Sequence, residues 1–102
     1  MKTEKEKMLS GELYDSMDVQ LYNERLKAKA LFAEYNSIKP VDEEKKRRIL
    51  SELICCELPI IIESPFYCDY GYNIEIGENF YSNFGCTILD VCKVKIGKNV
   101  MY

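Results

Sequence analysis

Histidine is absent from this sequence of 102 residues. Its absence removes the side chain that most often completes a mixed zinc site, and the cysteines show no CxxC spacing. They stand at Cys55, Cys56, Cys68, Cys86 and Cys92. We expect no metal site, and we expect reduced cysteines that act as small buried hydrophobic side chains. Cys86 and Cys92 in particular are expected to point inward for packing.

Long apolar runs are also missing. No stretch approaches the length needed to span a bilayer, and residues 1–7 are not followed by the hydrophobic core of a signal peptide. The net charge of −3 comes from both signs interspersed, whereas nucleic-acid binding normally needs a basic face with stacking aromatics. The sequence predicts a cytoplasmic protein that binds neither membrane nor nucleic acid. Its length allows one domain, or a small domain plus part of a second.

The first part of the chain shows helical patterns. Thr3 and Glu6 form a capping box for a short helix that should run towards Gly11. A second helix should begin near Asp18 and end within residues 36–40. Its apolar side chains are spaced to share one face, with three more beside them. These are Leu21, Ala28, Phe32 and Tyr35, flanked by Tyr22, Leu26 and Ala33.

A third helix should begin at Asp42 and stop before Pro59. The charge run of residues 42–48 places acids before bases, which suits the helix dipole, so it indicates a solvated helix start. A phosphate-binding face is the alternative. Apolar residues follow at helical spacing and should form a buried stripe. They are Ile49, Leu50, Leu53 and Ile54.

After Pro59 the helical period disappears, and β-branched, aromatic and glycine residues become frequent. Residues 74–80 recur as residues 94–100, an offset of 20 positions. Between them the chain divides into hexads whose fifth positions are Phe80, Cys86, Cys92 and, after a two-residue offset, Val100. Three six-residue faces would make one coil of a parallel β-helix with a two-residue bulge at a corner. An antiparallel hairpin with two similar turns is the alternative.

These segments resemble a known family. Residues 8–15, Glu24-Arg25-Leu26 and Tyr35-Asn36 resemble the helical cap of the maltose and galactoside O-acetyltransferases, and residues 65–71 and 79–84 resemble the first coil of their left-handed β-helix. The resemblance runs through the whole chain. It implies an α+β protein with a helical cap over residues 1–58 and the first coils of a hexapeptide-repeat, left-handed parallel β-helix, truncated, over residues 59–102.

The family resemblance implies transfer of an acetyl group from acetyl-CoA to a sugar hydroxyl, in a trimer with active sites between neighbouring β-helices. Such chemistry needs a base for the hydroxyl proton and donors for the oxyanion. In the family the base is a histidine on a later coil, in a segment that would begin after Tyr102. The residues that bind acetyl-CoA lie on later coils too. We therefore expect this chain to be inactive alone.

The resemblance assigns six residues of this chain to the acceptor-sugar pocket. They are Asp15, Arg25, Asp69, Tyr81, Asn83 and Asp90, with one residue of register uncertainty at Asp15 and Asp90. Each has a structural alternative: a mid-helix arginine is usually solvated or ion-paired, and Asp69, Asn83 and Asp90 could stabilise turns through their own side chains. The resemblance leaves the acceptor open between maltose, glucose and a galactoside, although an aspartate at position 69 leans towards the maltose-like branch.

Two hypotheses follow. In the first, the chain is part of an acetyl-CoA-dependent sugar O-acetyltransferase and carries half of its active site. In the second, it is a non-catalytic interaction or oligomerisation module. The second hypothesis rests on the edge of the last coil, where Ile96, Val100 and Tyr102 would be partly uncovered. Such an edge tends to pair with another copy.

Overall fold

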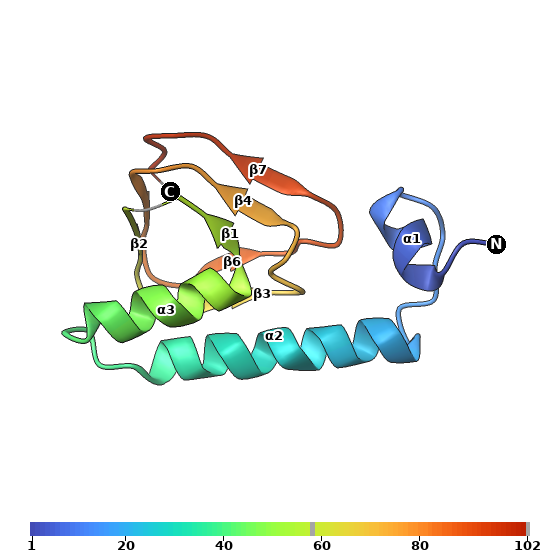
Figure 1. Ribbon diagram of the computed structural model, residues 1–102, viewed down its shortest axis with the longest axis horizontal. Helices are drawn as coiled ribbons and strands as arrows, with labels where there is room; N and C mark the ends of the chain where they lie inside the picture. Colours follow the sequence, from blue (N-terminus) through green and yellow to red (C-terminus); the bar gives the residue numbers. More distant parts are fainter. Residues whose placement is uncertain (58, 102) are drawn as a thin grey trace.

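The computed structural model describes residues 1–57 and 59–101. Three helices come first: α1 (Glu4–Leu9), α2 (Val19–Ser37) and α3 (Glu43–Leu53). Short strands follow, and they alternate with turns to the end of the described chain. These are β1 (Cys55–Cys56), β2 (Ile60–Ile62), β3 (Phe66–Cys68), β4 (Ile74–Ile76), β5 (Phe80–Ser82), β6 (Cys86–Ile88) and β7 (Val94–Ile96). In Figure 1, α2 and α3 run below the stacked coils, and α1 lies beside the coils on the right.

The helix starts predicted from sequence are confirmed. The Thr3 hydroxyl accepts from the Glu6 N–H and the Glu6 carboxylate accepts from the Thr3 N–H, which completes the capping box of α1. Asp18 caps α2, and Asp42 caps α3 by accepting from the Lys45 N–H at 3.3 Å. The predicted α2 face is buried at Leu21, Ala28 and Tyr35 and half-buried at Phe32, and the α3 stripe of Ile49, Leu50, Leu53 and Ile54 is buried throughout. Tyr22 and Leu26 are exposed.

All of the strand pairs are parallel and stack with the 20-residue offset expected from the repeat. Ile74 pairs with Val94, Phe66 with Cys86, and Ile60 with Phe80. Because three sheets, β1-β4-β7, β2-β5 and β3-β6, are visited in turn, the chain winds in a triangular coil. The hairpin alternative is therefore wrong. One corner, which we call the long corner, consists of the stacked segments 69–73 and 89–93; the short corner consists of 63–65 and 83–85.

One detail of the predicted register is corrected by the structure. Cys86 points into the core, as expected, but Cys92 does not occupy a strand. The two extra residues of each coil lie in the long corner itself, so Cys92 falls within that corner, half-buried. Its thiol donates to the Met8 carbonyl at 3.2 Å and thereby contacts α1.

Helix α2 is fixed to the β-helix near the short corner by polar contacts. The Tyr35 hydroxyl donates to the Ile62 carbonyl at 2.6 Å, and burial raises the pKa of this phenol to about 12. The Asn36 side chain accepts from the Phe66 N–H at 2.8 Å and donates to the Phe66 carbonyl at 3.0 Å. Backbone groups at the start of β3 are thus paired with the helix.

The change from helix to strand comes earlier than predicted. β1 begins at Cys55 and pairs with β4, so the first strand precedes Pro59. The division into units 1–58 and 59–102 stays a prediction, and its edge residues Leu58 and Tyr102 lie outside the described residues. Ile96 and Val100 are half-buried on the last coil, as expected. None of the helices in residues 1–57 and 59–101 has the length and apolar character needed to cross a bilayer.

Candidate functional site

The long corner is organised around the carboxylate of Asp90. This side chain is fully buried, at 0% exposure. One of its oxygens accepts from the N–H groups of Asp69 at 3.1 Å and Tyr70 at 2.9 Å. The other accepts from Gly71 at 2.8 Å and Asn73 at 3.2 Å. The expected contact between Asp90 and a sugar therefore finds no support in these bonds, which fit the turn-stabilising alternative.

Arg25 reaches the same corner from α2. Its guanidinium donates to the Tyr70 hydroxyl at 2.9 Å through Nη1 and to the Ser16 carbonyl at 2.6 Å through Nη2. The guanidinium also lies over the rings of Tyr70 and Tyr22, with centroid distances of 5.9 and 6.0 Å. Arg25 is thus neither freely solvated nor simply ion-paired, because it joins the helical cap to the β-helix.

Asp69 is half-buried beside this pair. Burial and the negative charge of Asp90 raise the pKa of the Asp69 carboxyl, and the positive charge of Arg25 acts in the opposite direction. Asp69 and Arg25 are therefore close enough to interact electrostatically. Asp69 lies in the long corner, and Arg25 reaches the same corner through its bond to Tyr70.

Asp15 lies in the exposed turn between α1 and α2. Its carboxylate accepts from the Met17 N–H at 3.0 Å, and its own N–H donates to the Glu4 carboxylate at 2.6 Å. Its neighbour Ser16 supplies the carbonyl that Arg25 contacts. Asp15 is accordingly one residue away from a direct link to Arg25.

Tyr81 and Asn83 lie elsewhere. Tyr81 is half-buried in β5, and Asn83 is exposed at the short corner, where its side-chain oxygen accepts from the Phe84 N–H at 2.8 Å. Sheet β3-β6 separates this corner from the long corner. Helix α2 follows that sheet from Arg25 to Asn36, which is about 16 Å at the helical rise per residue. Within one chain, Asn83 and Asp69 therefore lie at opposite ends of sheet β3-β6.

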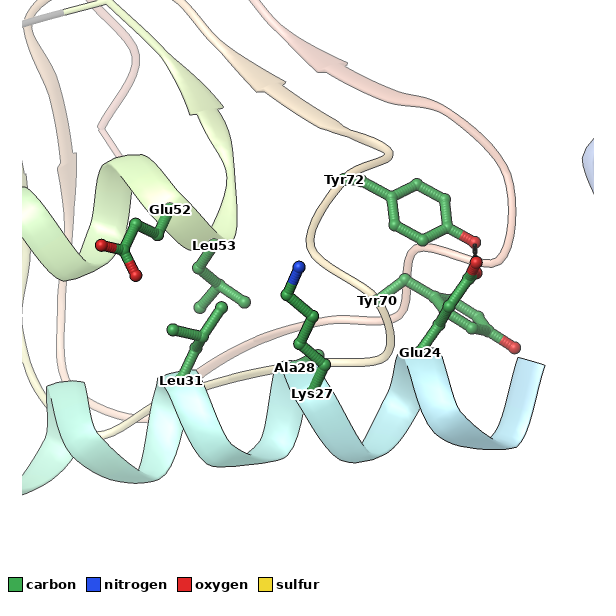
Figure 2. A pocket seen from close by; sticks show the side chains of 8 residues that line it. All are labelled: Glu24, Lys27, Ala28, Leu31, Glu52, Leu53, Tyr70 and Tyr72. Atoms are coloured by element: carbon green, nitrogen blue, oxygen red, sulfur yellow. Dashed lines mark hydrogen bonds between the residues drawn. The ribbon is translucent and has the colours of Figure 1, made fainter. Parts of the chain in front are cut away.

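A pocket of about 170 Å³ opens between α2, α3 and residues 70–72. Figure 2 shows Leu31 facing Leu53, with Lys27 between them and the tyrosines. The Tyr72 hydroxyl donates to the Glu24 carboxylate at 2.7 Å, and Lys5 forms an ion pair with Glu24 at 3.0 Å. None of the six predicted site residues lines this pocket. The two contacts of Glu24 attach Tyr72 of the long corner to α2 and connect α2 to α1.

Sequence reasoning missed the residues that hold this corner in place. Tyr70 accepts the Arg25 bond, Asn73 donates through its side chain to the Asp90 carbonyl at 2.8 Å, and Glu24 bonds Tyr72. The offset of 20 was the available signal, because it places Asp90 directly over Tyr70 in the stacked coils. Within residues 1–57 and 59–101, no cluster of three or more acidic or cysteine side chains could hold a metal ion.

Comparisons with known proteins agree with the resemblance. Residues 7–55 match the maltose acetyltransferase hexapeptide capping motif. A relative from Saccharomyces cerevisiae is 50% identical over 97 residues, covering 93% of this chain and 50% of the relative. Nodulation protein L of Rhizobium meliloti is 44% identical over 97 residues, covering 94% of this chain and 53% of the relative. The chain spans about half the length of the curated relatives it matches.

Solved structures show the same fold. A maltose O-acetyltransferase from Clostridium difficile superposes with a TM-score of 0.94 at 46% identity, covering 98% of this chain and 54% of that one. A galactoside acetyltransferase in complex with coenzyme A gives 0.82 at 33% identity, covering 99% and 54%. The expected fold class, a helical cap followed by coils of a left-handed parallel β-helix, is confirmed. Over nearly its whole length, the chain resembles one half of the maltose and galactoside O-acetyltransferases, which are hexapeptide-repeat acyltransferases.

Proposed function

We propose that this chain carries the acceptor-sugar side of an acetyl-CoA-dependent sugar O-acetyltransferase. The observation that carries the proposal is the long corner, where the Arg25 guanidinium bonds the Tyr70 hydroxyl and the half-buried Asp69 carboxyl is the preceding residue of the same segment. A guanidinium and a carboxylate give charge-assisted hydrogen bonds, which suit sugar hydroxyls because each hydroxyl both donates and accepts. Asp69, Arg25 and Asp15 are proposed as sugar contacts near the long corner. Tyr81 and Asn83 are proposed as sugar contacts near the short corner.

Acetyl-CoA is the proposed acetyl donor. A hexapeptide-repeat acetyltransferase from Vibrio cholerae, 27% identical to this chain, was solved in complex with acetyl coenzyme A. In the proposed reaction the sugar oxygen attacks the thioester carbonyl while a base takes the hydroxyl proton. The acyl C–S bond then breaks, the leaving coenzyme A sulfur receives the proton from the base, and the acetyl group stays on the sugar oxygen. The chain contains no histidine, so we propose that the base and the CoA site lie outside it.

A carboxylate does not easily replace the missing base in this chain. The sequence offers Asp90 for that role, but both of its oxygens accept from backbone N–H groups and it is fully buried. A general base must reach the proton that it removes. We therefore propose that the 102 residues alone transfer no acetyl group.

The two groups of site residues are proposed to meet across a subunit interface. Asp69 lies in the long corner of one chain, which Arg25 of α2 contacts through Tyr70. Asn83 lies in the short corner, on the far side of sheet β3-β6. A sugar bound by both groups therefore needs two copies. The family resemblance suggests a homotrimer, in which each long corner would face a neighbour's short corner.

Sugar titration tests the proposal. Maltose, glucose and a galactoside would be added to the isotope-labelled chain, and amide signals followed by NMR. Shifts at the long corner and around Tyr81 and Asn83, lost in Asp69→Ala, support the proposal, whereas no response to any sugar contradicts it. Acetyl transfer would be measured by mass spectrometry of the sugar, because thiol reagents would react with the chain's own cysteines. Acetylated sugar at an enzymatic rate would contradict the proposed inactivity.

Self-association is the second candidate function. Val94, Ile96 and Val100 are only half-buried on the last described coil, although they pack against the core. Covering them with another copy would bury this apolar surface. Sedimentation velocity over a range of concentrations would detect this. A monomer at all concentrations that also binds no sugar would leave both proposed functions without support.

A further inference from the structure

We infer that Asp90 and Asn73 are positioning residues for the candidate sugar site: they hold segment 69–73, which carries the Asp69 carboxyl and the Tyr70 hydroxyl that Arg25 contacts. The inference rests on the proposed function for its biological meaning. Its physical basis is the hydrogen-bond pattern of the long corner, which is independent of any sugar.

The first step is the number of bonds that converge on one side chain. A carboxylate has room for about four hydrogen bonds, and Asp90 receives four, all from backbone N–H groups of segment 69–73. In return, the Asn73 side chain donates to the Asp90 carbonyl at 2.8 Å. Asn73 is 5% exposed and Asp90 0%. Such reciprocal, buried pairing determines the backbone path of the segment.

The second step is that the segment is confined from the opposite side as well. Gly71 has φ +89, and a Cβ added there would lie 2.2 Å from the Leu53 carbonyl oxygen. The backbone at Gly71 therefore lies directly against the end of α3, where only glycine fits. Segment 69–73 is held between α3 and the Asp90 carboxylate.

The third step connects this path to the site. Asp69 and Tyr70 are the two residues whose N–H groups share one Asp90 oxygen. Their side chains are those near Arg25: Tyr70 accepts its hydrogen bond, and Asp69 senses its charge. A change in the Asp90 bonds would therefore move the carboxyl and the phenol relative to the guanidinium. Preorganised polar groups bind a ligand better than mobile ones, because less ordering is needed on binding.

Substitutions separate positioning from mere stability. In Asp90→Asn one acceptor oxygen becomes a donor amide, so two of the four N–H groups lose their partner. Asn73→Ala removes only the return bond and keeps the Asp90 charge. Tyr35→Phe is the matched control, because it removes one buried hydrogen bond near the short corner, between α2 and β2. The readouts are sugar affinity by NMR titration, amide hydrogen exchange, and the pKa of Asp69 from its carboxyl carbon signal.

We expect both long-corner variants to weaken sugar binding roughly tenfold at pH 8, while Tyr35→Phe binds like the parent chain. Loss of the Asp90 charge alone would lower the pKa of Asp69 and leave binding at pH 8 unchanged, so that result would overturn the inference. Equal affinity in Asn73→Ala and Tyr35→Phe would also overturn it.

If the parent chain binds no sugar, that result contradicts the proposed function but not the positioning role of Asp90 and Asn73. A comparison without sugar then tests the positioning role. Asn73→Ala should then accelerate exchange of the 69–73 amides and shift the pKa of Asp69, with neither change in Tyr35→Phe. If Asp90→Asn does not fold, Asn73→Ala carries the same test. An Asp69 pKa identical to the parent's in Asn73→Ala would overturn the inference.

Discussion

The two corners that carry predicted site residues are built in opposite ways. At the long corner, a buried carboxylate, a cap arginine and a tyrosine fix the backbone of residues 69–73 through contacts from distant parts of the chain. At the short corner, the exposed Asn83 is bonded to its sequence neighbours, the Phe84 N–H and the Ser82 hydroxyl, and Phe84 itself is 71% exposed. The long corner is complete within one chain, whereas the short corner presents its side chains outward.

This difference suggests how an acceptor site is divided. Groups that must be held at a fixed distance, such as Asp69 and Arg25, lie where the cap and the β-helix support each other. Groups that complete the site from a second copy can lie on an exposed turn, because docking would position them. The predictions below test this contrast between the two corners, in order of decreasing expected effect.

Alanine at the glycines of the two corners should have unequal effects. Gly71→Ala places a methyl group 2.2 Å from the Leu53 carbonyl oxygen at a positive φ, so it should cost about 3 kcal/mol or more in the free energy of unfolding. Gly85→Ala, also at positive φ but with open space around it, should cost roughly 1 to 2 kcal/mol. Urea denaturation followed by circular dichroism measures both. Equal losses would contradict the claim that only the long corner is confined.

Asn36→Ala tests the attachment of α2 beside the short corner. The change removes two hydrogen bonds to the Phe66 backbone, at 2.8 and 3.0 Å, so the free energy of unfolding should fall by about 2 kcal/mol. The same urea experiment applies, with exposed Asn23→Ala on α2 as the control. A loss no greater than in the control would show that the helix is held by apolar packing alone.

Arg25→Gln tests the electrostatics of the long corner. Because the guanidinium lowers the pKa of Asp69, its loss should raise that pKa further above the ordinary value. A group with a raised folded pKa stabilises the fold fully below its unfolded pKa and loses that contribution as pH rises through the folded pKa. In the variant this loss should begin at the same pH, the unfolded pKa, but extend to higher pH. Carbon NMR of the Asp69 carboxyl, with Arg48→Gln as control, would refute the account if the pKa stayed constant.

Sugar affinity should also depend on the ionisation of Asp69, but it should increase as pH rises, whereas the contribution of Asp69 to stability decreases. If ionised Asp69 accepts from sugar hydroxyls, affinity falls as pH drops through its raised pKa, and in Arg25→Gln the fall should occur at higher pH. Affinity measured between pH 4 and 8 checks this. A pH-independent affinity would remove Asp69 from the site.

Asn83→Ala should have the smallest effect on the fold. Its exposed side chain bonds only the adjacent N–H group, so the free energy of unfolding should change by less than about 0.5 kcal/mol. Thermal unfolding of the variant is the measurement. A loss similar to that of Asn36→Ala would show that the short corner is not simply an exposed turn.

Much of the fold could be predicted because its determinants are local or periodic. The capping box at Thr3 and the caps at Asp18 and Asp42 are read from neighbouring residues, and the 20-residue offset gives the register of every strand pair. The position of the two extra residues could not be read, since hexads starting at Ile76 can place them at either side of Cys92. In the structure they lie in the long corner, where Cys92 contacts Met8 of α1.

The site was predicted less completely, because its supporting contacts are long-range. Nothing near Asp90 in sequence indicates that it receives four N–H groups from a segment about one coil earlier. The Arg25–Tyr70 bond joins residues 45 positions apart. The resemblance identified Arg25 and Asp69 together with Asn83, but it did not show that one chain holds them at separate corners.

Mixing two variants tests that division most directly. Asp69→Ala disables the long corner, Asn83→Ala the short corner, and each alone should bind sugar weakly. If a site forms from the long corner of one copy and the short corner of another, mixed oligomers contain intact sites, so the mixture should recover sugar binding that neither variant shows. Recovery to an intermediate level is the predicted result. Absence of recovery in oligomers shown by mass spectrometry to contain both variants would contradict the account.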